Sequence, residues 1–598
     1  MSNHHSPGFD DQLLRHGASR GRFAGSEHPG APAVRILRLL AGIFRTPARF
    51  ATAGLILAAG CITVGEVFVV LRLSSWNADF FNLLEKKAVE GLITQIWIFL
   101  AIVVTMMCLQ GGSLETKMRL QMRLRTWLTR VVRDAWMADG RHYRLRYMSG
   151  EHANEEGRLT DDIRVSCEMV VEFGVSLLYS LTQIVLFSSV LWLNSGPLTI
   201  SAAGASLTIP GHMFWVAILY AIAGAIITIL IGHPLVRATD KRQTAEADYR
   251  ARLVISINHS QTIALSGAES GERRRLGAAF NRILDAWRIQ KTSFRNLIYF
   301  SAGYGTLTGV LPLLVLAPRY FSGDITLGAL MQVTIAFGQV TTALSWLSGN
   351  YSGIAQWEAS ASRVLALHEA VSDIDDEFEG DSAGRFTRAA INGPNLTFRD
   401  LSLFSPAGEI LVQRFSADLC PGERVLVEAT PHAAEGLFRA VAGLSFLGAG
   451  RIELPEGSAP LFMGEYPYLP ETTLLEALVE QQHLDKLDKD DVARVLVDVG
   501  LAKLVPLIER SGKWEQELGI EDRQRLGFAI AILRKPGWIL MHEATSALTQ
   551  AAEDQIVGIL EQRLPDAAII RITHRGVTER GFHRRISISD TAATGIES

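Results

Sequence analysis

Cysteine is scarce in this sequence of 598 residues, which holds only four: Cys61, Cys108, Cys167 and Cys420. None of them stands in a C-x-x-C spacing, so the sequence offers neither a zinc module nor the disulfide framework of a small secreted domain. An excess of positive charge is also lacking, because the formal net charge is -4, and this excludes a generally basic nucleic-acid binder. The N-terminus lacks the apolar core and small-residue cleavage site of a signal peptide. We expect a disordered cytoplasmic tail there.

Long apolar runs, in contrast, are frequent. The mean hydropathy is +0.18 and 48% of the residues are hydrophobic, a combination that excludes a disordered chain. Each of six runs is long enough to cross about 30 Å of hydrocarbon at about 1.5 Å per residue. They are Ala51–Leu73, Gly91–Gly112, Val170–Leu193, Gly211–Pro234, Asn296–Pro318 and Thr326–Leu347. The sequence therefore predicts six membrane helices.

Positive charges are unevenly distributed between these runs. Residues 113–169 hold 11 Lys and Arg and residues 235–295 hold 12, whereas the loops on the other side hold only Lys86, Lys87 and Arg319. Because cytoplasmic loops carry the excess of Lys and Arg, we expect both long segments and both termini in the cytoplasm, in a multi-pass protein of the inner membrane. Long membrane helices that continue into the cytoplasm in this way resemble an ABC exporter half.

A different pattern begins near Gly393. Short β-rich runs such as RVLVEA and WILMHEA alternate with helical stretches, which predicts an α/β domain with a largely parallel sheet. The expected fold class is thus an all-α transmembrane domain of six helices fused to a cytoplasmic α/β domain like that of ABC ATPases. The expected order is a disordered tail (1–40), the transmembrane domain (41–371), an acidic linker (372–392), the α/β domain (393–590) and a tail (591–598).

Four stretches resemble the transmembrane domain shared by SbmA/BacA-type peptide transporters, their ATPase-bearing bacterial relatives and the peroxisomal acyl-CoA half-transporters. They are WNADFFNLL (76–84), NEEGRLTDDIR (154–164), EADYR (246–250) and APRYFSGDITLGALMQVTIAFGQVTTALSW (317–346). In the second stretch Asn154, Arg158 and Asp162 match the family's box N-P-D-Q-R-I-x-x-D, while Glu155 and Gly157 replace its Pro and Gln. We expect the three matching residues to cap and brace a loop at the foot of the helices. The resemblance implies that this loop transmits motion between the domains.

Two carboxylates lie within the apolar runs. Glu66 lies in the first run and Glu172 lies near the cytoplasmic start of the third. A charge inside the bilayer is costly and must face a partner or a cavity, so each group is a proton relay, a cation ligand or one member of a structural ion pair. Arg72 is the nearest basic neighbour of Glu66, but a separation of six residues is poor for a pair on one helix face. We therefore treat Glu66 and Glu172 as candidate transport residues.

The C-terminal domain resembles an ABC ATPase whose phosphate loop is altered. In the family, the frame PGERVLV (421–427) is followed by G-x-x-G-x-G-K-S/T, whose backbone N–H groups and Lys hold phosphate and whose Ser or Thr binds Mg²⁺. Here the sequence continues EATPHAAEGLFRAVAGL, one residue short, with Gly436 as the only glycine left in the loop and Glu435 where phosphate would lie. No lysine occurs between Pro421 and Asp485.

The remaining nucleotide motifs are changed as well. Four positions depart from the family pattern. Glu465 replaces a metal-contacting Gln, and His542 replaces a Mg²⁺-ordering Asp. In the signature sequence, Gly519 replaces the Ser and Glu521 replaces the Gly. Two positions are retained, because Glu543 matches the family's catalytic base and His574 matches its switch histidine. We expect no intrinsic ATPase activity, no metal site and no cofactor, and ATP with Mg²⁺ is implied only by the resemblance.

These features leave three functions open. In the first, two identical chains form a dimer that moves peptides or other amphipathic molecules and is driven by a proton gradient. In the second, the chain is the inactive half of a heterodimer energised by an intact partner. In the third, it is a membrane receptor or scaffold that no longer transports. The altered signature would face the partner's intact loop in a heterodimer, so the sequence favours the first. The expected partners are membrane lipid, a second half-transporter and an amphipathic substrate, without nucleic acid.

Overall fold

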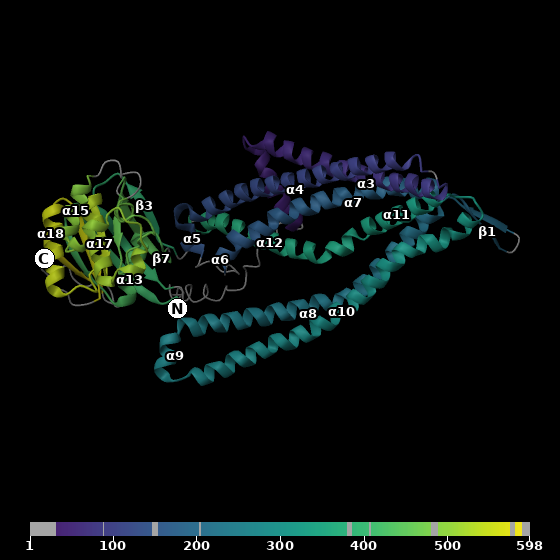
Figure 1. The fold of residues 1–598 in the computed structure, drawn as a ribbon. Coiled ribbons are helices and arrows are strands. Elements are labelled where there is room, and N and C mark those ends of the chain that lie inside the picture. The colour runs from purple at the N-terminus through teal and green to yellow at the C-terminus, as the bar shows by residue number, and fades with distance from the viewer. Residues whose placement is uncertain are drawn as a thin grey trace, which may run out of the picture. The chain divides into compact units, whose positions relative to one another are not determined.

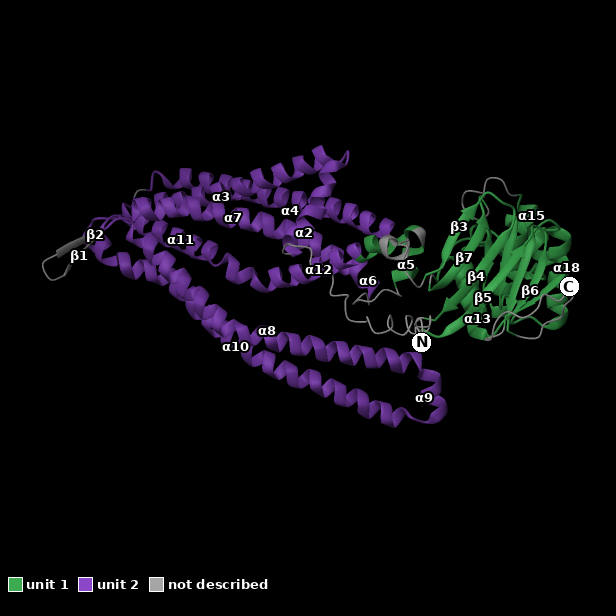
Figure 2. Ribbon diagram, turned by 180° about the vertical axis from the view of Figure 1, so that it is seen from behind, with its two compact units in different colours: residues 1–27, 136–152, 370–598 green, residues 28–135, 153–369 purple. Residues whose placement is uncertain are grey.

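The chain divides into two compact units (Figure 2). The membrane unit comprises residues 28–135 and 153–369, and most of the other, which we call the α/β unit, comes from residues 370–598. The computed structural model describes residues 32–87, 89–145, 154–202, 205–379, 385–405, 408–445, 447–457, 459–479, 488–574 and 581–588. The expected tail of residues 591–598 and most of the expected tail of residues 1–40 lie outside these ranges.

Six helical segments of the described chain are long and apolar enough to cross a membrane, which confirms the predicted number. They are built from α3 (Arg49–Glu85), α4 (Leu92–Met137), α7 (Ile163–Asn194), α8 (His212–Asn258), α10 (Glu269–Phe321), and α11 (Leu327–Leu344) followed by α12 (Trp346–Glu379). Several extend far beyond their apolar runs. The 53 residues of α10 span about 80 Å at 1.5 Å per residue, more than twice the hydrocarbon thickness.

Short elements connect these long helices. They are α2 (Pro32–Ala41), η1 (Gly42–Arg45), η2 (Ala138–Gly140), α5 (Arg141–Arg144), α6 (Glu155–Gly157), the π-helical turn η4 (Arg158–Asp162), α9 (Ser260–Ser266), and the antiparallel strands β1 (Leu198–Ala202) and β2 (Ala205–Ile209). Residues 32–40 are therefore helical, although they fall in the expected tail. Ile36 and Leu40 are buried, and this burial stabilises α2. The hairpin of β1 and β2 was not expected from the sequence.

Helices α8 and α10 run side by side and are joined at one end by α9 (Figure 1). In both ribbon views this pair diverges from α3, α4, α7 and α12. Tyr220 of α8 and Tyr304 of α10 stack with ring centroids 4.4 Å apart, and the Tyr220 hydroxyl donates a hydrogen bond of 2.6 Å to the Tyr304 carbonyl. Gly224 makes this possible, because a Cβ at that position would lie 2.4 Å from the Tyr304 ring.

Two stretches that carry the family resemblance meet at the start of α11. The backbone N–H of Gly328 donates a hydrogen bond of 3.0 Å to the side chain of Asn82 on α3. The N–H of Leu327 donates a hydrogen bond of 3.0 Å to Glu85. A Cβ at position 328 would lie 2.1 Å from the carbonyl oxygen of Ala78. The glycine thus lets α11 begin directly against α3, whose side chains bind the free N–H groups of its first turn.

The α/β unit contains two sheets. In the described residues its strands are β3 (Thr387–Ile391), β4 (Leu396–Phe404), β5 (Ile410–Leu419), β6 (Arg424–Glu428), β7 (Gly448–Pro455), β8 (Leu461–Met463), β9 (Trp538–His542), β10 (Ala568–Thr573) and β11 (Arg584–Ser587). One sheet is parallel throughout, in the order β11-β6-β10-β9-β8, as the sequence predicted. The other, in the order β3-β7-β4-β5, is mostly antiparallel and was not predicted.

Two apolar clusters hold the unit together. The helical elements are α13 (Pro431–Val441), α14 (Leu474–Leu478), α15 (Lys489–Asp498), η6 (Ala502–Leu507), α16 (Trp514–Glu517), α17 (Ile520–Arg534) and α18 (Gln550–Arg563). One cluster joins α13 to both sheets, and the other joins the parallel sheet to α14, α15, α17 and α18. The parallel sheet is therefore buried on both faces, which explains its continuous apolar strands.

The expected linker of residues 372–392 is structured at both ends. Helix α12 continues to Glu379, and β3 begins at Thr387. The helix continues because its next turn carries Val371 and Ile374, both buried. Residues 380–384 lie outside the described ranges.

Candidate functional site

Three membrane helices bring the two candidate carboxylates to the same lysine. The Nζ of Lys117 on α4 lies 3.4 Å from Oε2 of Glu172 on α7. The carboxylate of Glu66 on α3 accepts a hydrogen bond from Ser113, which lies one helical turn before Lys117, and it is close enough for an electrostatic attraction to Lys117. Glu66, Lys117 and Glu172 therefore form one cluster of three charges, which we call the membrane charge cluster.

The cluster corrects the partner that the sequence suggested for Glu66. Arg72 pairs instead with Asp79, about two turns further along α3, at 3.7 Å. Lys117 was missed because it lies 51 positions away in the sequence and approaches Glu66 only through helix packing. It also lies beyond the end of the second apolar run, so no sequence signal placed it beside a membrane carboxylate.

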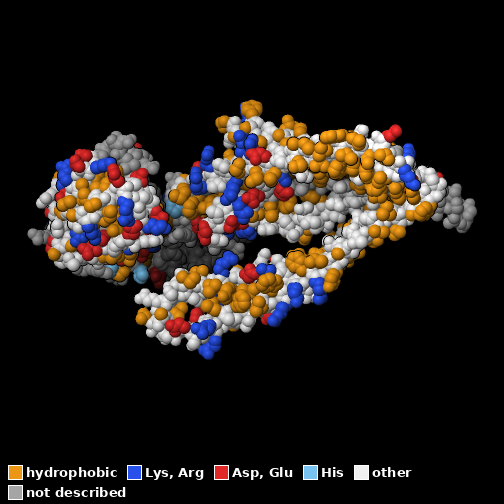
Figure 3. Space-filling view, in the orientation of Figure 1, with side chains coloured by type: hydrophobic (Ala, Val, Ile, Leu, Met, Phe, Trp, Pro, Cys, Tyr) orange, Lys and Arg blue, Asp and Glu red, His pale blue; other side chains and the backbone are white. Residues whose placement is uncertain are grey.

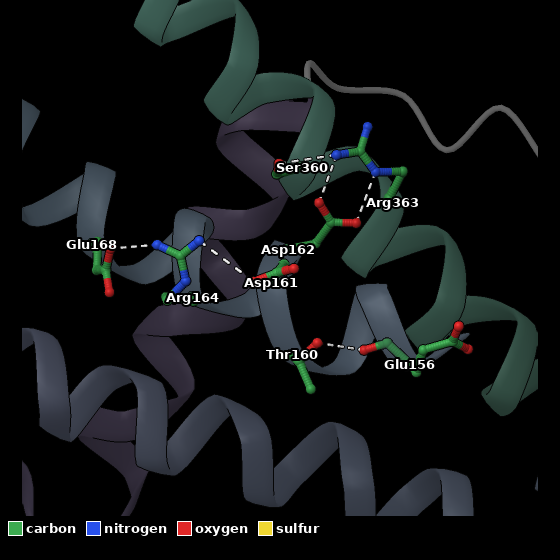
Figure 4. A network of polar contacts seen from close by, with 8 residues as sticks. All are labelled: Glu156, Thr160, Asp161, Asp162, Arg164, Glu168, Ser360 and Arg363. Atoms are coloured by element: carbon green, nitrogen blue, oxygen red, sulfur yellow. Dashed lines mark hydrogen bonds and ion pairs between the residues drawn. The ribbon is translucent and has the colours of Figure 1, made fainter. Parts of the chain in front are cut away.

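The loop with Asn154, Arg158 and Asp162 is braced by an ion pair between two segments of the membrane unit. Arg363 on α12 donates two hydrogen bonds to the carboxylate of Asp162, of 2.8 and 2.6 Å (Figure 4), and a third to Ser360 of 3.0 Å. Paired geometry of this kind fixes both position and orientation. The side chains of Arg158 and Asp162 are buried.

Asn154 plays a different part from the one expected. Its backbone has φ +67°, and its side chain makes no capping hydrogen bond to α6. The side chain lies instead over Gly157, where a Cβ would be 2.6 Å from the Asn154 amide nitrogen. This packing accounts for the small residue at position 157.

In the α/β unit, the connection between β6 and α13 is very short. Strand β6 ends at Glu428 and α13 begins at Pro431, so only Ala429 and Thr430 separate them. A phosphate loop of the form G-x-x-x-x-G needs about six residues at this point. The N–H of Ala429 is already bonded to the Thr573 carbonyl at 3.0 Å. This connection therefore lacks the length of a phosphate loop, and one of its two N–H groups is already bonded.

The two residues singled out in this segment both lie on α13. Gly436 is helical, so the expectation that it belongs to the loop is wrong. A Cβ there would lie 2.9 Å from the side chain of Leu411, which shows that the glycine serves close packing. Glu435 pairs with Arg439 one turn later, at 2.5 Å. The helix extends toward β6 because Pro431 suits a first helical position and Ala433 and Ala434 are strong helix formers.

His542, Glu543 and His574 lie together at the end of β9 and β10. Oε1 of Glu543 lies 3.1 Å from Nδ1 of His574, and the backbone of Glu543 is left-handed with φ +54°. The His542 ring lies against Phe438, with centroids 5.5 Å apart. Burial lowers the pKa of His542, while the charges of Glu543, Glu435 and Glu465 act in the opposite direction. Four other candidate nucleotide-site residues, Glu435, Glu465, Glu543 and His574, are thus near enough to His542 to act on its charge.

The altered signature residues begin α17. Gly519 precedes the first turn of the helix, and Glu521 pairs with Arg525 at 2.9 Å. The next important side chain, Gln524, is 1% exposed. It donates hydrogen bonds to the carbonyl of Glu465 and to the hydroxyl of Ser546, of 3.1 and 2.9 Å. Gln524 therefore ties α17 to the segments that follow β8 and β9.

Sequence reasoning missed both Gln524 and a buried charge pair. Arg571 on β10 pairs with Glu553 on α18 and donates a hydrogen bond of 2.8 Å to Thr545. An Arg in the middle of a strand gives no sign of such a partner. Among the described residues, no group of three or more His, Cys, Asp or Glu side chains is arranged to hold a metal ion.

Comparison with known proteins shows what the membrane helices are similar to. Residues 39–321 match the family model for ABC transporter transmembrane region 2. This segment is similar to the transmembrane regions of ABC transporters. The match begins within α2 and ends with α10, so it includes the membrane charge cluster and the loop around Asp162. The expected relation to ABC half-transporters and the multi-pass membrane character are thereby confirmed.

Three relatives share this region and also align with the α/β unit. The chain is 27% identical over 517 residues to the inner membrane ABC transporter ATP-binding protein YddA of Escherichia coli, covering 86% of this chain and 90% of that protein. It is 26% identical to the chloroplastic ABC transporter D family member 2 of Arabidopsis thaliana, covering 89% and 82%. It is 23% identical to the human lysosomal cobalamin transporter ABCD4, covering 88% and 89%.

Proposed function

We propose that this chain is one half of a dimeric inner-membrane transporter that moves peptides or other amphipathic molecules and is driven by a proton gradient rather than by ATP. The observation that carries the proposal is the two-residue connection between β6 and α13. A transporter of this architecture without a phosphate loop needs another source of free energy. A proton gradient is such a source, and the membrane charge cluster offers groups that couple to it.

The argument against ATP rests on lost ligands. Hydrogen bonds to charged groups contribute about 1.5–3 kcal/mol each. Without the phosphate-binding Lys and the Mg²⁺ ligands, about 4–8 kcal/mol of binding free energy is missing, which corresponds to about 10³–10⁶ in affinity. The carboxylate of Glu435, one turn into α13, adds repulsion. The Glu543–His574 pair, at 3.1 Å, is then a structural contact and not a catalytic one.

Lys117 supports the proposal that a proton gradient drives transport. When Glu66 is ionised, Lys117 is attracted by two carboxylates, Glu66 and Glu172. When Glu66 is protonated, only Glu172 holds the ammonium. Proton uptake thus changes the force between α3, α4 and α7. A potential of about 100 mV supplies roughly 2.3 kcal/mol for each charge that crosses the membrane, which is enough to bias two conformations of the bundle.

Topology and substrate follow from the charge pattern and the helix surfaces. With Lys and Arg concentrated in residues 113–169 and 235–295, both termini lie in the cytoplasm. A dimer has twelve membrane helices. The name of the human relative gives cobalamin as its cargo, and the SbmA/BacA-like motifs favour peptides. Large exposed apolar side chains along the helices suit any amphipathic cargo.

Uptake of a labelled peptide by cells that express the chain tests this function. We expect uptake above that of control cells, and we expect a proton uncoupler to abolish it. Cells that express Glu66→Gln should take up as little peptide as cells that express the unaltered chain in the presence of the uncoupler. Uptake that resists the uncoupler and requires a second, intact half-transporter would favour the heterodimer instead. A chain that is dimeric and correctly inserted but moves nothing would favour a receptor or scaffold.

A further inference from the structure

A cavity between α8 and α10 combines cations with aromatic rings. It has a volume of about 400 Å³ and is lined by Arg242 on α8 and by Trp287, Gln290, Lys291, Phe294, Arg295 and Ile298 on α10. On α10, positions 287, 291, 294 and 298 recur at intervals of three to four, and position 295 follows 291 by four, so these residues share one helix face. Basic and apolar side chains lie next to each other along this pair of helices (Figure 3).

One wall of the cavity is fixed by hydrogen bonds. Gln290 is 6% exposed; it accepts a hydrogen bond of 3.0 Å from Arg242 and donates one of 3.0 Å to Thr239. Arg242 is held over the ring of Trp287, 4.7 Å from its centroid, and its charge is balanced by Glu246 at 2.7 Å. Arg242 therefore forms a rigid wall whose charge is already compensated.

Lys291 and Arg295 differ from Arg242 in this respect. Among the residues that the structure describes, no carboxylate pairs with either of them. Both side chains are exposed while they line the cavity. Two uncompensated cations beside Phe294 and Ile298 fit a ligand that carries a negative charge at one end and an apolar chain at the other.

The bounds of the apolar runs place the cavity at the expected depth of lipid headgroups. Arg295 directly precedes the fifth apolar run, and Lys291 lies five residues before that run, which is about 7 Å along a helix. On α8, Thr239 and Arg242 are level with Gln290 and follow the end of the fourth run at Pro234. Headgroups extend about 5–8 Å beyond the hydrocarbon on each side, so Lys291 and Arg295 lie where lipid phosphates lie.

We propose that this cavity binds an anionic phospholipid, with the headgroup phosphate between Lys291 and Arg295 and an acyl chain along Phe294 and Ile298. Basic pockets between membrane helices on the cytoplasmic side are suited to such headgroups. The site is separate from the membrane charge cluster, which lies on α3, α4 and α7, and does not depend on how transport is energised.

Native mass spectrometry of the full-length chain in detergent, titrated with phosphatidylglycerol, tests the proposal. We expect Lys291→Gln/Arg295→Gln to bind the lipid about tenfold to thirtyfold more weakly, as the loss of two surface cations predicts. The matched control Arg274→Gln/Arg282→Gln removes two exposed α10 cations outside the cavity and should bind normally. Lys291→Arg should also bind normally, because it keeps the charge.

Other outcomes would overturn the site. Equal binding of phosphatidylcholine with the same acyl chains would show that the cations do not select the headgroup. Displacement of the lipid by glycerol phosphate at equal concentration would show a site for a soluble phosphate. A change in oligomeric mass of the double variant would show that a second copy covers this face. Should the double variant not fold, Lys291→Gln alone carries the test, with an expected loss of about fivefold.

Discussion

The ammonium of Lys117 lies 3.4 Å from the carboxylate of Glu172, and the same ammonium attracts Glu66 from a third helix. Lys117 thus forms an ion pair with one acid and acts on the second through its charge. This arrangement is sensitive to one proton, because protonation of either carboxylate changes the net charge of the cluster from -1 to zero. The proposed energy coupling therefore depends on Lys117 as much as on Glu66.

The first prediction concerns this lysine. In Lys117→Gln, two carboxylates lose their common cation, and repulsion between ionised forms favours a permanently protonated Glu66. We expect uncoupler-sensitive peptide uptake to fall at least tenfold while the amount of inserted dimer is unchanged. Lys117→Arg should keep most of the uptake, since it keeps the charge. Unaltered uptake in Lys117→Gln would remove the membrane charge cluster from the mechanism.

The second prediction concerns the α/β unit and ATP. Calorimetric titration of the purified full-length chain with ATP and Mg²⁺ should show no binding in the micromolar range, because the connection between β6 and α13 has only two residues. Glu543→Gln should leave uptake unchanged, since a base without a bound nucleotide has no substrate. Tight Mg²⁺-dependent binding of ATP would contradict both statements.

The third prediction concerns topology. In a cysteine-free background, a cysteine at Thr199 in the β1–β2 hairpin should react with an impermeant thiol reagent added to intact cells. A cysteine at Ala268, between α9 and α10, should react only after the membrane is opened. The two positions lie at opposite ends of α8 and its extension, so they report opposite sides. The reverse labelling pattern would refute a cytoplasmic location of both termini.

The fourth prediction concerns pH. Burial holds the pKa of His542 below its ordinary value of 6.5, so the unfolded chain binds this proton more readily than the folded one. The stability that the neutral ring contributes is complete above pH 6.5 and declines as the pH falls toward the lowered pKa. Hydrogen exchange of the β9 segment, corrected for its intrinsic pH dependence, should accelerate between pH 7 and pH 5. His542→Gln should lose most of this acceleration, and an equal response in both proteins would refute it.

Much of the architecture follows from local sequence patterns. The membrane helices are set by apolar runs, and the parallel sheet is set by short apolar strands such as WILMH, since both signals lie within a few turns or one strand. The sheet of β3, β4, β5 and β7 escaped prediction because its strands are only partly buried and lack the continuous apolar runs of the parallel sheet. The partner of Asp162 could not be predicted from local patterns, because Arg363 lies 201 positions away in the sequence.

In the candidate site, too, some features could be predicted from the sequence and others could not. Motif comparison matched His542, Glu543 and His574 to separate family positions, and the structure groups them at the ends of neighbouring parallel strands. The motif comparison could not show that Gly436 lies in a helix, because a glycine in a shortened motif does not indicate the residue at which α13 begins. Local residue preferences favour helix initiation at Pro431, and packing stabilises it further, since Ala433, Ala434 and Leu437 are buried against the sheets.

The two-residue connection also sets what it would take to build a phosphate loop between β6 and α13. The connection is about four residues shorter than such a loop. The residues that follow it form the first turn of α13 instead. Lengthening the connection therefore requires an insertion or the unwinding of a turn whose Ala433 and Ala434 are buried in the core. Substitutions alone would unpack that turn before they lengthened the loop, so the packing of α13 resists the design of a phosphate site at this position.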